Sequence, residues 1–159
     1  MLSKLNHLPT MWQRIQTLYL FLSGVTATLL LLLTLFTIEP TGAEASYAAN
    51  FTGIIAKGWT SIKYFNLVTF VLTSLVTIIS FATIFLYKWR KLQIRLTIIG
   101  LLLMVAAIVA FGYMIWQQAG TTRMQVWLLL PLVNLICQYL AMRNIIKDDI
   151  LVRASNRLR

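Results

Sequence analysis

The apolar positions along the chain fall into four long runs that contain no charged residue. They cover residues 18–38, 65–87, 96–116 and 124–142, and each is 19 to 23 residues long. A helix needs about 20 such residues to cross a hydrocarbon core of roughly 30 Å. The runs do not alternate apolar and polar residues, as the strands of a membrane barrel do. The pattern predicts an all-α polytopic membrane protein with a bundle of four transmembrane helices.

The segments between the runs complete a single predicted membrane domain, residues 1–159. Residues 39–64 are the longest connection, expected as an outer loop that holds a short hairpin or an interfacial lid. Within it, Asn50-Phe51-Thr52 matches an N-glycosylation acceptor, a match that would be incidental in a bacterial protein. Residues 143–159 alternate charged and apolar positions, which favours a helical tail along the inner membrane surface. A cleaved signal peptide is the alternative for the first run, which exceeds the usual apolar length of about 7 to 15 residues.

The composition supports the membrane class. Hydrophobic residues make up 59% of the chain and charged residues 11%, with a mean hydropathy of +0.79. A soluble domain has roughly 25% charged residues. The single cysteine, Cys137, excludes an internal disulfide.

Lys and Arg are distributed unequally among the connecting segments. Three lie in the first and third connections: Lys57, Lys63 and Arg123. The other 11 of the 14 lie in the terminal segments and the second connection. Positive residues favour the cytoplasmic side, so both termini and the second connection of this multi-pass protein are predicted to be cytoplasmic. All five tryptophans lie near predicted span ends, where amphipathic rings favour the headgroup region.

The basic residues also form a candidate binding face on the cytoplasmic side. The candidate contacts with a lipid or protein partner are Arg14, Lys88, Arg90, Lys91, Arg95, Arg153, Arg157 and Arg159. Anionic membrane lipid is one expected partner, because each basic residue near the surface can gain about 1 kcal/mol from it. The alternative is that these residues only set the orientation. Nucleic-acid binding is disfavoured, because basic tails are ordinary in membrane proteins.

A few uncharged polar residues within the runs are candidates for intramembrane contacts. They are Thr69, Thr73 and Ser80 in the second run and Asn134 and Gln138 in the fourth. Hydrogen bonding between helices is the favoured interpretation. A polar path, or a ligand site made of the two amides and a carbonyl freed by Pro131, is the alternative.

The residues needed for catalysis are missing from the runs. His7 is the only histidine and lies outside them, so the chain does not supply a bis-histidine haem site or a histidine-rich metal site. Cys137 has no histidine partner in the membrane. No ionisable carboxylate, Lys or Arg lies in a run, which disfavours a proton-coupled pump. The sequence therefore predicts no catalytic residue, metal or cofactor, and a protein that is not an enzyme.

Three segments resemble one protein family. They are "MWQRIQTLYLFL" from Met11, "YKWRKLQIRL" from Tyr87, and the closing "RNIIKDDILVRASNRLR". They are similar to a family of small four-span bacterial inner-membrane proteins of unknown function, with the opening MxQRIQTLYL and the closing LVRxxxRLR. Trp12 replaces the isoleucine usual in that opening. The resemblance implies four spans and an inner-membrane location, raises Met11 as an alternative start, and provides no catalytic residues.

Two classes of function remain. The first is a non-catalytic membrane scaffold or accessory subunit that binds a protein or lipid partner. The second is a small transporter or channel that works as an oligomer. The charge-free runs favour the first class, because intramembrane charges mark ion and proton pathways.

Overall fold

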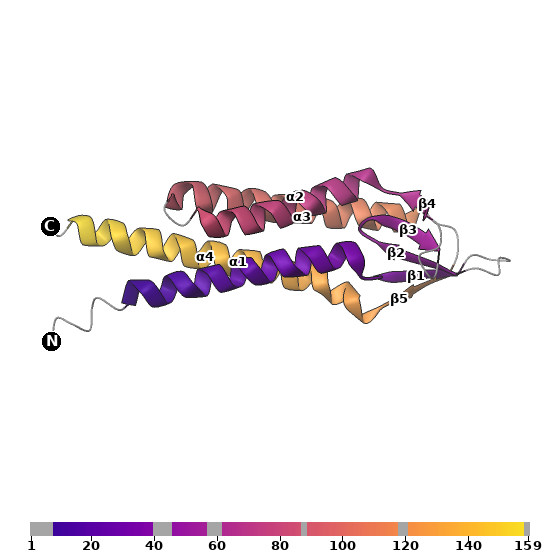
Figure 1. The fold of residues 1–159 in the computed structure, drawn as a ribbon, viewed down its shortest axis with the longest axis horizontal. Helices are drawn as coiled ribbons and strands as arrows, with labels where there is room; N and C mark the ends of the chain where they lie inside the picture. The colour runs from indigo at the N-terminus through magenta and orange to yellow at the C-terminus, as the bar shows by residue number, and fades with distance from the viewer. Residues whose placement is uncertain (1–7, 40–45, 57–61, 87–88, 118–120, 158–159) are drawn as a thin grey trace.

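Four long helices and one small β-sheet make up the protein in the computed structural model (Figure 1). The structure describes residues 8–39, 46–56, 62–86, 89–117 and 121–157. The helices are α1 (Leu8–Leu32), α2 (Leu67–Phe85), α3 (Arg90–Trp116) and α4 (Leu130–Arg157), with the 3-10 helix η2 (Val126–Leu129) before α4. Among these described residues, four helices are long and apolar enough to cross a membrane. The prediction of a mostly helical, four-span protein is confirmed.

The sheet is built from both connections at one end of the bundle. Its strands are β1 (Phe36–Glu39), β2 (Tyr47–Asn50), β3 (Gly53–Ala56), β4 (Ile62–Phe65) and β5 (Thr121–Met124). They pair antiparallel in the order β4-β3-β2-β1-β5. The sheet lies at the end of the molecule opposite to both termini (Figure 1). The bundle therefore has a sheet end and a terminal end.

The helices form a closed ring. α1 packs against α2 and α4, and α3 completes the ring by packing against the same two helices. The chief apolar cluster extends from the bundle into the sheet, and includes Leu30, Met104, Phe111, Ile38 and Ile54. Sheet and helices thus share one core.

The sheet corrects the expected bounds of the first span. The run 18–38 predicted a helix to Ile38, but α1 ends at Leu32 and Phe36–Glu39 forms β1. The Leu35 amide donates to the Ala49 carbonyl across 2.9 Å, and β1 then pairs with β2 and β5. Outside a helix these backbone groups need such partners. The expectation of an all-helical chain is therefore amended by a sheet that draws on the end of an apolar run.

The basic second connection is more helical than expected, and the basic tail is helical as expected. α3 begins at Arg90, so the second half of the basic second connection is helix. α4 continues as one helix to Arg157, and its last turns extend beyond the other helices along the same direction (Figure 1). A helical tail is observed, but it prolongs the fourth helix rather than turning aside from it.

A tight turn between β2 and β3 inserts into the sheet end of the bundle. The Asn50 side-chain oxygen accepts from the Thr52 amide and the Gly53 amide, each across 3.1 Å, and from the Thr52 hydroxyl. Gly53 has φ 147°, a conformation that glycine adopts without a Cβ penalty. Asn50 is 1% exposed and its oxygen is occupied by the turn, so the glycosylation match falls on a buried residue.

The turn places Phe51 inside the bundle. Phe51 is fully buried and stacks on Phe111 of α3, with ring centroids 4.5 Å apart and an interplanar angle of 12°. Its amide donates to the Leu30 carbonyl of α1 across 3.4 Å. Aromatic pairs of this kind contribute about 0.5–1.5 kcal/mol beyond the area they bury. Phe51 thus connects the sheet to two helices.

Replacing Phe51 should strongly destabilise the protein. Phe51→Ala is expected to lower the free energy of unfolding by about 3–5 kcal/mol, because it leaves a cavity and removes the stacking. Denaturant titration in detergent micelles measures this loss. Phe85→Ala is the matched control, since Phe85 is 80% exposed, and should change the value by about 0.5 kcal/mol or less. Equal losses in the two variants would show that Phe51 does not anchor the sheet.

Candidate functional site

Uncharged polar side chains run along the interior of the bundle. They come from all four helices, and each is at most 5% exposed: Gln16, Ser23, Thr26, Thr69, Thr73, Ser80, Thr83, Gln93, Thr97, Asn134 and Gln138. Lipid offers no water to satisfy such groups, so they have to bond to one another or to the backbone. The helices therefore have to supply the hydrogen-bond partners of these interior side chains.

Most of the interior threonines bond back to their own helix. The Thr73 hydroxyl donates to the Thr69 carbonyl across 2.8 Å, and the Thr97 hydroxyl donates to the Gln93 carbonyl across 2.8 Å. The Thr69 hydroxyl donates to the Asn66 carbonyl across 3.2 Å. This pattern occupies the only hydroxyl hydrogen that each side chain has. Thr69 and Thr73 are thus buried, but their donors are used within α2.

Asn134 of α4 is the centre of a cluster that joins three helices. Its Nδ2 donates to the Ser23 carbonyl across 2.7 Å and to the Thr26 hydroxyl oxygen across 2.8 Å, both on α1. Its Oδ1 accepts from Gln138 Nε2 across 2.9 Å. The Ser23 and Ser80 hydroxyls lie 3.3 Å apart, which brings in α2. The structure thus brings Ser80, Asn134 and Gln138 into one connected cluster.

Sequence reasoning missed the role of Thr26 in this cluster. Ser23 and Thr26 lie three residues apart in the first run and therefore on one helix face. A buried Asn amide with two donors requires acceptors on a neighbouring helix, and the helix face with Ser23 and Thr26 could supply them. Without knowing that α1 packs on α4, the pairing of Asn134 with Ser23 and Thr26 does not follow from the sequence.

Gln138 carries an unusual buried atom. Its Oε1 has no hydrogen-bond partner among the described residues, although the side chain is only 2% exposed. The atom faces α3 at Gly100, where an added Cβ would lie 3.4 Å from it. Glycine thus leaves room for α3 beside the amide. The cluster provides acceptors and neutral donors, but no acid, base or nucleophile.

Pro131 does not supply the free carbonyl that the ligand-site hypothesis used. Pro131 is the second residue of α4, and the Trp127 carbonyl four residues before it accepts from the Leu130 amide. Proline is tolerated in a first helical turn, where its missing N–H is not required. At this position Pro131 frees no carbonyl inside the helix, so the alternative of a ligand site that uses such a carbonyl loses this support.

The described basic side chains gather at the terminal end. Lys91 and Arg95 in the first turns of α3 and Arg143 and Lys147 in α4 are exposed. Arg123 at the sheet end is the exception among the Lys and Arg side chains that the structure describes. Of the other predicted contacts, Arg14 lies in α1, Arg90 begins α3, and Arg153 and Arg157 lie in the last turns of α4. Lys88 and Arg159 lie outside the described residues.

Polar contacts also tie the helices together near this end. Gln16 Nε2 donates to the Asn144 carbonyl across 3.0 Å, linking α1 to α4. Gln93 Nε2 donates to the Thr83 carbonyl across 3.4 Å, linking α3 to α2. Asp148 of α4 is 7% exposed, so the end contains a buried carboxylate as well as exposed cations. The Gln16 and Gln93 contacts therefore fix the relative positions of the helices that carry the basic residues.

Within the described part of the chain, no three His, Cys, Asp or Glu residues lie close enough to hold a metal ion. Cys137 is a buried free thiol in α4.

These features define a small polytopic membrane protein, a four-helix bundle with an uncharged, hydrogen-bonded interior and a sheet at one end. A family model described as a domain of unknown function, DUF4293, matches residues 12–158, and the chain belongs to this family. That family is uncharacterised, in keeping with the resemblance noted in the sequence. No curated protein sequence matches the chain.

The two amides of the cluster should differ in their contribution to stability. Asn134→Leu is expected to destabilise the protein by about 2 kcal/mol, because it removes bonds to α1 and leaves Gln138 without its acceptor. Gln138→Met should cost less than about 1 kcal/mol, because it also removes an unpartnered buried oxygen. Unfolding titrations in detergent micelles compare the two. A Gln138→Met loss equal to or above that of Asn134→Leu would contradict this assignment.

Proposed function

We propose that the protein is a non-catalytic scaffold or accessory subunit of the inner membrane, whose basic terminal end binds anionic lipid or an acidic surface of a partner protein. The observation that carries the proposal is the segregation of charge. The described cations other than Arg123 project from α3 and α4 at one end, whereas the interior cluster is neutral. A working surface at the end of the bundle fits this division better than a pathway through it.

The geometry of the terminal end supports a binding role. Lys91 and Arg95 lie four residues apart on α3, and Arg143 and Lys147 lie four residues apart on α4, so each pair shares a helix face. α3 and α4 pack against each other, which puts both pairs on neighbouring helices. Basic residues next to a membrane are attracted to anionic lipid by about 1 kcal/mol each. Four such residues can enrich anionic lipid around the protein.

The proposed cytoplasmic orientation rests on the same residues. Both chain termini and the α2–α3 connection lie at the terminal end (Figure 1). Eleven of the 14 Lys and Arg residues belong to these segments. This asymmetry supports a cytoplasmic terminal end and a sheet on the opposite side of the inner membrane.

A small transporter or channel that works as an oligomer is the second candidate. The unpartnered Gln138 Oε1 favours it, because a buried acceptor can receive a hydrogen bond from a passing solute. The other amide atoms of the Asn134–Gln138 pair are already bonded within the bundle. The scaffold is therefore the better supported function.

Reversing the basic end should reduce lipid binding. The variant with Lys91, Arg95, Arg143 and Lys147 all changed to Glu is expected to lose most of its enrichment for anionic lipid, by roughly tenfold or more. Lipids that co-purify from nanodiscs of equal anionic and zwitterionic content provide the measurement. Arg123→Glu at the sheet end is the control and should retain the enrichment. Unchanged anionic lipid and unchanged protein partners in the fourfold variant would leave the basic end with an orienting role only.

The orientation has a separate test. In a Cys137→Ala background, Thr122→Cys at the sheet end should react with an impermeant thiol reagent added to intact spheroplasts, whereas Lys91→Cys should react only after lysis. Both parent residues are exposed, so access within the protein does not limit the reaction. The reverse pattern of labelling would overturn the proposed orientation.

A further inference from the structure

A cleft lies at the sheet end of the bundle, away from the interior cluster and the basic end. It has a volume of about 260 Å³ and is lined by Thr34, Thr37, Tyr47, Ala48, Gln125 and Trp127. The lining combines hydroxyls and an amide with aromatic rings. Sites for small molecules commonly have such a mixture of apolar walls and a few placed polar groups.

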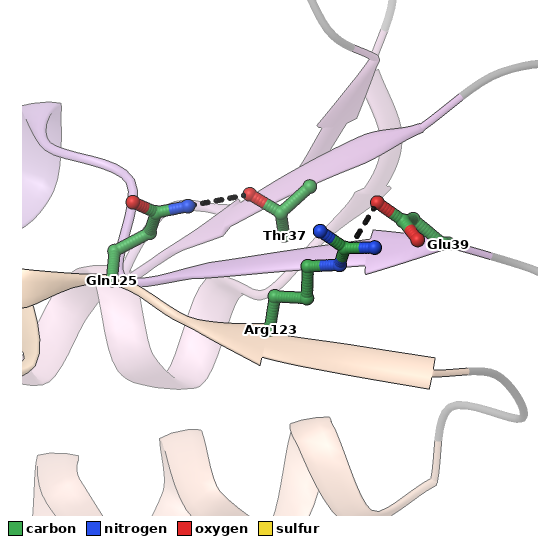
Figure 2. A network of polar contacts seen from close by, with 4 residues as sticks. All are labelled: Thr37, Glu39, Arg123 and Gln125. Carbon is green, nitrogen blue, oxygen red and sulfur yellow. Dashed lines mark hydrogen bonds and ion pairs between the residues drawn. The ribbon is translucent and has the colours of Figure 1, made fainter.

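The polar side of the cleft is fixed by hydrogen bonds. The backbone N–H of Gln125 donates to the Leu35 carbonyl across 2.9 Å, which holds Gln125 beside the end of α1. Its side-chain Nε2 donates to the Thr37 hydroxyl oxygen across 3.1 Å (Figure 2). This bond uses one hydrogen of the Gln125 side-chain amide and leaves the other free. The Thr37 hydroxyl hydrogen is also free, so both side chains can donate to a ligand.

The cleft lies where the headgroups of a bilayer are expected. Thr34 follows the end of α1, and Trp127 belongs to the helical turn that leads into α4. Tryptophan favours this interfacial level. Exposed apolar side chains follow the cleft residues along the chain, with Leu129 of η2 61% and Leu132 of α4 56% exposed. A lipid with its headgroup in the cleft would thus have an apolar track for its acyl chains.

Two opposite charges stand beside the cleft in a defined order. Arg123 pairs in register with Thr37, whereas Glu39 lies two residues further along β1, away from the helices. Two strand residues span roughly 6.6 Å. Arg123 Nε and Glu39 Oε1 lie 3.3 Å apart, with the side chains 70% and 45% exposed (Figure 2). The backbone position of Arg123 is therefore nearer the membrane, and that of Glu39 is further from it.

We propose that this cleft binds the headgroup of a zwitterionic phospholipid with a primary ammonium group, the phosphoethanolamine class. In such a lipid the phosphate is nearer the acyl chains and the ammonium further away, the same order as Arg123 and Glu39. The guanidinium binds the phosphate through charge-assisted hydrogen bonds, and the carboxylate accepts from the ammonium. Thr37 and Gln125 donate to the phosphate and ester oxygens.

Arg123 and Glu39 together also provide selectivity among phospholipid headgroups. A phosphoglycerol headgroup carries no cation and would leave the Glu39 carboxylate next to an anionic ligand. A phosphocholine headgroup has a cation, but its quaternary nitrogen has no hydrogen to donate to Glu39. Phosphoethanolamine alone among these three offers an anion to the free guanidinium hydrogens of Arg123 and a hydrogen-bonding cation to Glu39, while the Arg123–Glu39 pair stays in place. This inference does not rest on the basic end, which lies at the opposite end of the bundle.

Competition among three lipids tests the proposal. The full-length protein is purified in mild detergent, mixed with equal amounts of phosphoethanolamine, phosphocholine and phosphoglycerol lipids of identical acyl chains, and examined by native mass spectrometry. The phosphoethanolamine lipid should be retained roughly threefold or more over the phosphocholine lipid, a ratio typical of exposed ion pairs. It should exceed the phosphoglycerol lipid by the same ratio in the variant with Lys91, Arg95, Arg143 and Lys147 changed to Glu, because that variant removes the anionic lipid bound at the basic end. Equal retention of the three lipids would overturn the proposal.

Variants separate the two charges and the cleft itself. Glu39→Gln should abolish the preference for phosphoethanolamine over phosphocholine, and Arg123→Gln should weaken the retention of all three lipids. Ala48→Leu should lower phosphoethanolamine retention by filling the cleft without changing charge. Trp89→Phe at the terminal end, where Trp89 is 69% exposed, is the control and should behave as the unmodified protein. Retention of the original preference in folded Glu39→Gln and Ala48→Leu proteins would show that the lipid binds elsewhere.

Discussion

The need to satisfy a buried amide in a water-free interior governs the arrangement of this bundle. Asn134 lies on a membrane-crossing helix and is fully buried, so its donors must find acceptors on neighbouring helices. It does so on α1, through the Ser23 carbonyl and the Thr26 hydroxyl. The position of α1 against α4 then brings Ser23 next to Ser80 of α2. One side chain thereby helps to set the register of three helices.

The sheet extends the same constraint to the ends of the helices. Backbone groups that leave a helix near the membrane surface also need partners, and the two connections at this end supply them to each other as paired strands. Phe51, inserted by the β2–β3 turn, couples this sheet to α1 and α3. The bundle is consequently held in its interior and at one end. The described cations other than Arg123 lie at the other end, and this division underlies the proposed scaffold.

The helices were predictable because lipid requires a minimum run of apolar residues, and runs such as 65–87 and 96–116 meet it. The strands were predictable only in part. A short hairpin was one expectation for residues 39–64, and β2 and β3 form one, but each strand is four residues long and Phe36–Glu39 begins inside an apolar run that continues α1. Composition alone does not distinguish the end of a span from a buried strand. Likewise, Asn134 and Gln138 were identifiable as buried amides, but the contact of Asn134 with Ser23 joins residues 111 positions apart and depends on helix packing.

Access of water to the interior tests most directly whether the polar cluster is structural. Ser23→Cys and Ser80→Cys, each in a Cys137→Ala background, would be exposed to a small water-soluble methanethiosulfonate in reconstituted vesicles, with Lys91→Cys as the accessible reference. Ser23 is fully buried and Ser80 is 4% exposed, so both cysteines should remain unmodified while the reference reacts under conditions that open all vesicles to the reagent. Modification of either interior cysteine at a rate near that of the reference would show a water-filled path through the bundle and contradict the account.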